Sequence, residues 1–272
     1  MRIDDLRAGF DGKFRLKKHA PDETFGVSKD HAEESLVRHV SELQDLHELL
    51  YAENRRALLI VLQGMDAAGK DGTIKHVMSG VNPQGCAVTS FKQPSTLELA
   101  HDFLWRIHAA VPAKGAIGIF NRSHYEDVLI ARVHNLVPKT VWRQRYGQIR
   151  AFEEMLAENG VHILKFFLHI SKAEQERRFE ERMQDANKNW KASAADFQER
   201  RYWDDYQKAY EEAIAKCSAK YAPWYVIPSD RKWFRNFAVA EIVIQTLQSM
   251  RMKFPKVDAE ALAHLSSQPS KP

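Results

Sequence analysis

Residues 58–73 read LLIVLQGMDAAGKDGT. The apolar run 58–62 has the composition of a buried strand, and it leads directly into the spacing G-x-x-x-x-G-K over residues 64–70. A loop of this type turns successive backbone N–H groups inward, the next helix presents its positive end, and the lysine reaches across a bound anion. The stretch therefore predicts a phosphate-binding loop (P-loop); a glycine-rich turn with a solvated lysine is the alternative. The residues expected to line the phosphates are Gly64, Met65, Ala67, Ala68, Gly69, Lys70, Asp71, Gly72 and Thr73.

Two acids set this loop apart from an ordinary P-loop. Asp66 lies inside the loop, and Asp71 stands where the common motif has a Ser or Thr that binds magnesium. A bare carboxylate repels phosphate strongly at low dielectric, so Asp66 makes sense when Mg²⁺ lies between the two. We therefore predict Mg²⁺ as the cofactor and Asp66 as a ligand, with a loop-capping carboxylate as the alternative. Asp71 belongs either to the metal's outer shell or to the charge complement of a helix N-terminus.

The rest of the chain predicts a parallel sheet around this loop. Five short runs rich in Ile, Val, Leu and Phe read as buried strands, and most of the segments between them are long enough for a crossover helix. Connections of this kind are right-handed and place helices on both faces of the sheet. We expect a three-layer α/β, P-loop kinase-like fold with a five-stranded parallel sheet and a helical lid. The expected strands cover 57–63, 86–91, 116–121, 162–170 and 224–228.

A second cluster of polar residues, IFNRSHYED at 119–127, follows the third expected strand. Ligands of open α/β sheets bind at the carboxyl ends of strands, so Arg122 and Glu126 should face the P-loop. Arg122 suits a phosphate clamp, and Glu126 could hold a metal ion or orient the acceptor; a helix-surface salt bridge is the alternative for Glu126. We assign His124 no chemistry, because a phosphate oxygen that attacks another phosphate is already anionic near neutral pH.

The lid is expected at about 171–215. Ser171 and Glu174 match the capping box S-x-x-E, which predicts the start of a highly charged helix, and a polar span at 187–193 separates it from a second helix.

Three further residues are candidates for ligand contacts. Arg178 and Arg182 fall on one helical face at i, i+4 and could reach a transferring phosphoryl group; neighbouring glutamates could equally neutralise them in place. Asn82 opens the turn 82–85, which could approach a nucleotide base or be a loop without a ligand.

Composition limits the class of protein. The chain has 272 residues, of which 44% are hydrophobic and 28% charged, and its net charge is +4. With two cysteines and no zinc spacing, neither a disulfide scaffold nor a structural zinc site is expected. No apolar run approaches the length of a membrane helix, no basic stripe indicates nucleic acid, and the acidic start of the chain argues against secretion, so we expect a cytoplasmic protein.

No repeat or flexible linker divides the chain. We expect an N-terminal arm at 1–30, a P-loop phosphotransferase domain at 31–250 and a C-terminal tail at 251–272.

These motifs resemble those of polyphosphate kinase family 2, and within it class III, the polyphosphate-dependent AMP/ADP phosphotransferases. The resemblance runs from about residue 30 to 250 and includes Glu126, where the other classes tend to have Asn. The matching blocks are 64–76, 82–85, 89–92, 120–129 and 222–233.

The resemblance implies a Mg²⁺-dependent enzyme that moves terminal phosphoryl groups between inorganic polyphosphate and adenine nucleotides, with other purine nucleotides left open, and that forms a homo-oligomer. Its implied active centre consists of Asp66, Lys70, Arg122 and Glu126, with Asp66 and Glu126 as metal ligands and two lid clamps at Arg178 and Arg182.

Two other functions remain compatible with the motifs. One is an ATP-dependent nucleoside monophosphate kinase of the same fold, and the other is a P-loop protein that binds a nucleotide without catalysis.

Overall fold

The computed structural model describes residues 1–187, 189 and 194–256. Its centre is a five-stranded sheet in the order β2-β3-β1-β4-β5, in which all neighbouring strands are parallel. The predicted parallel α/β sheet is therefore confirmed. Its strands are β1 Ala57–Gln63, β2 Cys86–Ser90, β3 Ile117–Asn121, β4 Val161–His169 and β5 Trp224–Pro228.

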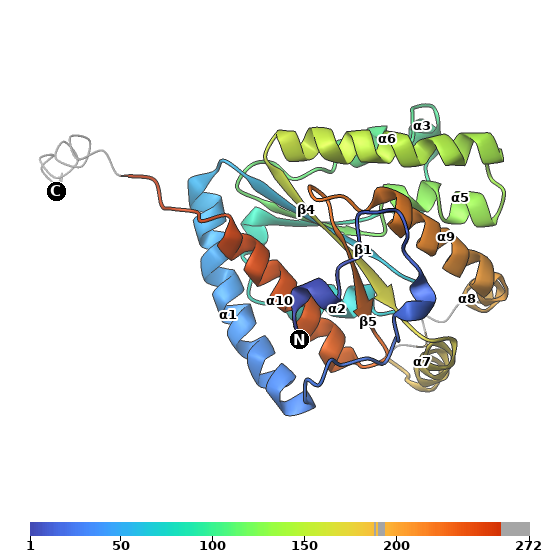
Figure 1. Cartoon of the computed structure of the whole chain (residues 1–272), viewed down its shortest axis with the longest axis horizontal. Helices are drawn as coiled ribbons and strands as arrows, with labels where there is room; N and C mark the ends of the chain where they lie inside the picture. Colours follow the sequence, from blue (N-terminus) through green and yellow to red (C-terminus); the bar gives the residue numbers. More distant parts are fainter. Residues whose placement is uncertain (188, 190–193, 257–272) are drawn as a thin grey trace, which may run out of the picture.

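Helices cover both faces of the sheet (Figure 1). One face carries α1 Lys29–Glu53, α2 Lys70–Val77 and α10 Lys232–Ser249, and α1 packs along α10 although the two lie at opposite ends of the sequence. The other face carries α6 Lys139–Glu158 and α9 Trp203–Cys217. Three short helices lie outside these layers: α3 Thr96–Leu99, α4 Trp105–His108 and α5 Ile130–Val133.

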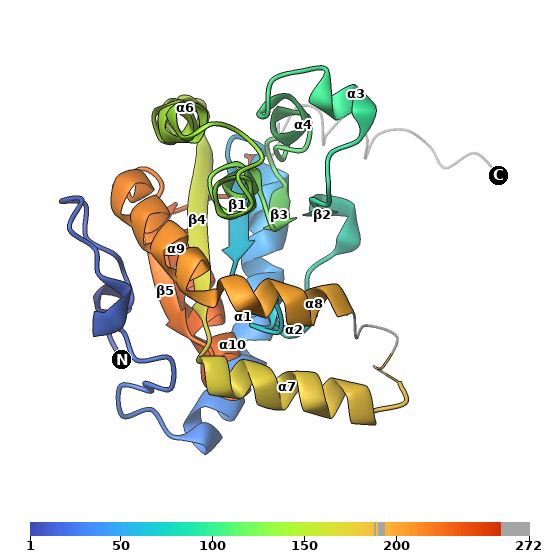
Figure 2. The ribbon, with the colours of Figure 1, turned by 90° about the vertical axis from the view of Figure 1, so that its right-hand side faces the viewer.

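The expected lid region lies beyond the carboxyl ends of the strands (Figure 2). It contains α7 Lys172–Gln184 and α8 Ala194–Glu199, and it leads into α9. Ser171 caps α7 as predicted, because its hydroxyl accepts a hydrogen bond from the backbone N–H of Glu174 at 3.1 Å. Of the polar span predicted at 187–193, residues 188 and 190–193 lie outside the described residues.

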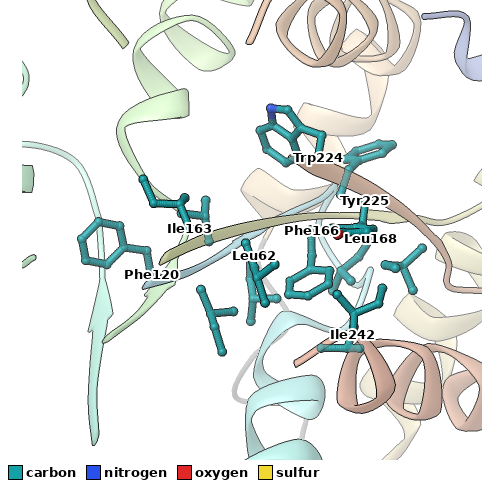
Figure 3. Packing of buried hydrophobic residues seen from close by; sticks show 14 of the residues in the cluster. Leu62, Phe120, Ile163, Phe166, Leu168, Trp224, Tyr225 and Ile242 are labelled. Atoms are coloured by element: carbon teal, nitrogen blue, oxygen red, sulfur yellow. The ribbon is translucent and has the colours of Figure 1, made fainter. Parts of the chain in front are cut away.

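The core forms where the central strands meet the helices. Figure 3 shows Phe166 of β4 directed toward Ile242 of α10, while Trp224 of β5 lies on the other side of the sheet. All three side chains are at most 1% exposed, and burying such a side chain contributes about 1.5–3 kcal/mol to stability. The alternation of strand side chains therefore supplies both helical layers with apolar contacts.

The N-terminal segment is part of this core. Leu6, Ala8, Phe14 and Leu16 are buried. The backbone of residues 6–8 pairs antiparallel with β5, since Ala8 N donates to Trp224 O at 2.9 Å. The segment thus covers an edge strand that would otherwise expose unpaired backbone groups. Within the ranges that the structure covers, no helix is long and apolar enough to cross a membrane. Most of the expected C-terminal tail, residues 257–272, lies outside the described residues.

We expect Leu6→Ala to lower the free energy of unfolding by about 2–4 kcal/mol, because Leu6 is 1% exposed and its loss leaves a cavity under the arm. Urea unfolding measures the change. Arg2→Ala is the control, since the Arg2 side chain is 85% exposed and its loss should change stability by less than about 0.5 kcal/mol. Equal stability of Leu6→Ala and the wild type would show that the arm is not part of the cooperative core.

Candidate active site

The P-loop joins the carboxyl end of β1 to the first turn of α2. Two of its residues, Ala67 and Gly69, adopt positive φ angles of 60° and 105°, which let the chain curl tightly before the helix begins at Lys70. The Lys70 Nζ donates to the carbonyl oxygens of Gly64 at 2.7 Å and Met65 at 3.3 Å. The lysine is thereby held across the loop where phosphates are expected.

The Lys70 ammonium group is buried, and burial disfavours its protonated form. Burial in the loop, helped by the nearby charge of Arg122, lowers the pKa of Lys70 to about 8, although Asp66, Glu126 and Asp71 act in the opposite direction. An anion bound at the loop would favour the protonated form. The charge of this lysine therefore depends on what the site holds.

Arg122 brings the two predicted clusters together. Its guanidinium lies 2.7 Å from Asp66 Oδ1 and 3.6 Å from Glu126 Oε2. The backbone N–H of Arg122 extends the sheet by donating to Leu62 O at 3.1 Å, and its φ of 64° turns the residue sharply at the end of β3. Burial acts to lower the pKa of Arg122, but the two carboxylates raise it above its usual value. The expected approach of Arg122 and Glu126 to the P-loop is present.

Asp66 and Glu126 suit a magnesium ion. They flank one guanidinium, so both carboxylates reach the same small region beside the loop. Within the described ranges, no group of three or more His, Cys, Asp or Glu side chains forms a ready-made metal cage. Mg²⁺ commonly uses one or two carboxylates and completes its shell with water and substrate phosphate, so this donor set fits the ion.

The other polar side chains of the loop bind within the protein. Asn121 Nδ2 donates to Asp71 Oδ1 at 2.8 Å, which ties the start of α2 to the end of β3. The Thr73 hydroxyl donates to Gly69 O at 3.1 Å, and its backbone N–H donates to the same oxygen at 2.9 Å. Thr73 thus closes the first turn of α2, and the phosphate contact expected for it stays a prediction.

Arg178 of α7 lies against the back of the P-loop. It is 6% exposed, and its Nη1 donates to Ala67 O at 2.9 Å and Ala68 O at 3.2 Å. Its Nε donates to Glu174 Oε1 at 2.7 Å, and Nη2 binds the backbone carbonyls of Ser229 and Asp230. In this structure its donors hold the back of the P-loop and pair with Glu174, as the alternative interpretation expects, and the phosphate clamp at Arg178 stays a prediction.

The contacts of Asn82 agree with the alternative of a loop without a ligand. Its side chain accepts a hydrogen bond from Gln84 N at 3.0 Å and caps the short 3₁₀ turn before β2. Since α2 carries the chain away from the P-loop edge, Asn82 lies at the amino edge of the parallel sheet. Arg182, in contrast, lies over the ring of Phe179 at 5.6 Å, and its contact with phosphate stays a prediction.

Gln175 and Tyr210 are among the residues near the loop that sequence reasoning missed. Gln175 Nε2 donates to Asp66 O at 2.9 Å. Tyr210 of α9 is buried, with its hydroxyl 3.5 Å from Gln63 Oε1, and burial followed by the charge of Glu126 raises its pKa well above the usual range. Both side chains are spaced as ordinary packing residues, so only the folded arrangement places them here.

A buried ion pair supports the cluster at 122–126 from below. Lys165 Nζ donates to Glu153 Oε2, and it also binds Tyr125 Oη at 2.9 Å and Cys217 O at 2.7 Å. Glu153 Oε1 accepts from Tyr125 Oη at 2.9 Å, and His124 Nε2 lies 3.2 Å away from it. Burial alone would raise the pKa of Glu153, but Lys165 and His124 lower it below its usual value. His124 and Tyr125 thus position their neighbour Glu126.

We expect Lys165→Met to lower the free energy of unfolding by about 3–5 kcal/mol, because it leaves the Glu153 carboxylate buried without its partner. Chemical denaturation measures the loss. The double variant Lys165→Met/Glu153→Gln removes both charges and should recover part of it. A double variant as unstable as the sum of both single variants would contradict the ion-pair interpretation.

The pKa of Lys70 predicts how anion binding depends on pH. A lysine with a pKa of about 8 loses its charge as pH rises through that value, so affinity for tripolyphosphate without metal should fall between about pH 7 and 9.5. Lys70→Arg keeps its charge over this range and should show a flatter profile. Calorimetric titrations at several pH values measure both, and parallel profiles would rule out Lys70 as the titrating group.

Comparison with known proteins identifies this arrangement. A family model described as polyphosphate kinase 2 matches residues 26–255. The AMP/ADP-polyphosphate phosphotransferase of Meiothermus ruber is 54% identical over 248 residues, which cover 90% of this chain and 93% of the relative. The ADP-polyphosphate phosphotransferase of Rhodopseudomonas palustris is 50% identical over 244 residues, covering 85% and 84%. The crystal structure of polyphosphate kinase 2 from Arthrobacter aurescens TC1 matches with a TM-score of 0.92 at 41% identity, over 97% of this chain and 95% of that one. This chain therefore belongs to the polyphosphate kinase 2 family.

Proposed function

We propose that this protein moves the terminal phosphoryl group of inorganic polyphosphate to AMP and ADP, giving ADP and ATP, and that it catalyses the reverse transfer. The observation that carries the proposal is the meeting of Asp66 and Glu126 around Arg122, beside the lysine of the P-loop. This arrangement combines fixed cations with carboxylates that suit a metal ion, as two polyanionic substrates require. The name of the Meiothermus ruber relative supports the choice of polyphosphate, AMP and ADP as substrates.

The proposed reaction needs no general base. A terminal phosphate oxygen of the nucleotide attacks the terminal phosphorus of polyphosphate in line, and the bond to the bridging oxygen breaks as the new P–O bond forms. The shortened polyphosphate leaves as an anion, so no proton has to be moved. Catalysis then consists of positioning the reactants and compensating their charge.

The side chains of the loop divide this work. Lys70 and the inward-facing N–H groups bind the phosphate oxygens, and Arg122 stands where donor and acceptor phosphates would meet. Mg²⁺, held by Asp66 and Glu126 together with substrate oxygens, would neutralise charge and align the two phosphates. Tyr210, buried beside Glu126, helps to keep water from the reacting groups.

Further parts of the proposal rest on the sequence. We retain the cytoplasm as the place of reaction, a homo-oligomer as the assembled form, and other purine nucleotides as acceptors to be tested. The domain boundaries at 31 and 250 likewise stay proposals.

Donor choice tests the reaction. The purified protein, incubated with Mg²⁺, polyphosphate and ADP, should form ATP in a luminescence assay, and with AMP it should form ADP. An ATP-dependent monophosphate kinase would phosphorylate AMP with ATP and leave polyphosphate unused. A protein that only binds nucleotide would form no product with either donor.

Loss of Asp66 or Lys70 should abolish most of the activity. We expect Asp66→Asn and Lys70→Ala each to lower kcat by at least about 100-fold, because each removes charge compensation in the transition state. Asp66→Asn should also raise the Mg²⁺ concentration that gives half-maximal rate. Asp45→Asn, at an exposed position of α1, is the matched control and should keep wild-type activity. Near-normal turnover by either active-site variant with an unchanged unfolding midpoint would refute the assignment.

A further inference from the structure

A buried arginine of α10 reaches the back of the P-loop. Arg235 is 3% exposed, and its Nη1 donates to Ala68 O at 3.1 Å. Its Nε and Nη2 donate to Asn236 Oδ1 at 3.2 and 2.9 Å. The guanidinium therefore lies under the loop, on the side away from the expected phosphates.

Among the described residues, no carboxylate oxygen lies within 4 Å of this guanidinium. The hydrogen-bond partners that the structure gives it are a backbone carbonyl and the neutral amide of Asn236. Burial, and then the charge of Arg178, lower the pKa of Arg235 to about 9. The buried Lys165, by contrast, has Glu153 as a partner, and Arg178 has Glu174. In the part of the chain that the structure describes, Arg235 is thus a buried cation whose charge no neighbouring acid balances, which is costly for the folded state.

The P-loop is shaped to admit this side chain. A Cβ atom at Gly69 would lie 1.8 Å from Arg235 Nη1, and one at Gly72 would lie 3.2 Å from Nη2. The glycine before the P-loop lysine therefore permits two things at once: the φ of 105° and the close approach of a guanidinium from behind.

The contact with Ala68 O also orients the loop. In a trans peptide the carbonyl oxygen and the following N–H point in opposite directions. Because Arg235 and Arg178 both bind Ala68 O, the N–H of Gly69 is directed away from these arginines. An N–H on that side of the loop is available to a phosphate oxygen.

We propose that Arg235 is a positioning residue for polyphosphate, a buried cation that aims the Ala68–Gly69 peptide at the phosphates and whose charge the bound polyanion balances. The inference rests on the proposed function, because it requires phosphate in the P-loop. The negative charge of bound phosphate then compensates the buried charge of Arg235, which destabilises the folded protein when no phosphate is bound. Arg235 so contributes to affinity without touching the substrate.

The decisive variant is Asn236→Asp. It is nearly isosteric, keeps both hydrogen bonds to Arg235, and places a carboxylate against the guanidinium. We expect its unfolding midpoint without ligand to be equal to or higher than that of the wild type, while its affinity for tripolyphosphate falls about tenfold or more. A purely structural contact would not produce this combination. Gln245→Glu, an exposed position on the same helix with the same change in charge, is the control and should bind as the wild type does.

Arg235 variants provide a second line of evidence. Arg235→Gln should weaken tripolyphosphate binding and raise KM for polyphosphate more than it lowers kcat, and Arg235→Lys should recover part of the affinity. Calorimetry gives the dissociation constants, and thermal unfolding with and without 1 mM tripolyphosphate gives the ligand-induced shift.

Two results would overturn the inference. One is wild-type affinity in Asn236→Asp; the other is a lower midpoint of that variant without ligand together with an unchanged ligand-induced shift. If the wild type itself failed to bind tripolyphosphate, the proposed function would fall together with this inference. The wild-type titration therefore separates the two failures.

Discussion

At the carboxyl edge of the sheet, like charges lie close together in a partly buried site, in which Lys70 is 9% exposed and the Arg122 side chain 40% exposed. Cations attract a polyanion most strongly when water is excluded, but the same exclusion makes unbalanced charge costly to the fold. The charge of Arg122 is compensated because its guanidinium lies between Asp66 and Glu126. Lys70 donates hydrogen bonds to loop carbonyls, and its pKa is lowered. These contacts with carboxylates and carbonyls stabilise the two cations in the absence of substrate, and they fix the positions of both side chains.

The shape of the P-loop depends on hydrogen bonds from segments far apart in the sequence. Gln175 and Arg178 of α7 and Arg235 of α10 all donate to backbone carbonyls of the loop, over the stretch Asp66–Ala68. Each carbonyl that is held from behind fixes the orientation of the next N–H. The P-loop is therefore shaped by two helices that follow it by more than a hundred residues, and the core that packs α10 on the sheet also sets the geometry of the phosphate site.

Apolar runs and the glycine spacing were enough to predict the sheet and the loop, since both signals are local. The bounds of β1 and β5 match the expected ones, those of β2 and β3 differ by one residue at one end, and those of β4 differ by one residue at both ends, where hydrogen-bonded pairing frays. For Asn82, topology favours the loop alternative over a nucleotide contact: a helix that starts at the carboxyl edge carries the chain to the amino edge before the next parallel strand. The contacts of Arg178 were not predictable for another reason: helical spacing gives a face and not the partner of a guanidinium, which can bind backbone carbonyls as well as phosphate. Gln175 and Arg235 carried no local signal, since their role exists only where α7 and α10 meet the loop.

The same contacts limit how the lid can move. The first turns of α7 are fixed to the loop by Gln175 and Arg178, and Ser171 N is bound to Asp230 Oδ1 at 2.8 Å. Arg200 ties the following segment to α7 through Lys172 O and Glu176, so the base of the lid is cross-linked on both sides. A movement of α7 as a whole would break the hydrogen bonds that orient the P-loop and would disorganise the phosphate site as it closed. These contacts involve the first turns of α7, and Arg182 lies beyond them, near the carboxyl end of the helix. This separates two arginines that share one helical face: Arg178 binds backbone carbonyls of the P-loop, whereas Arg182 lies one turn further along α7, over the ring of Phe179.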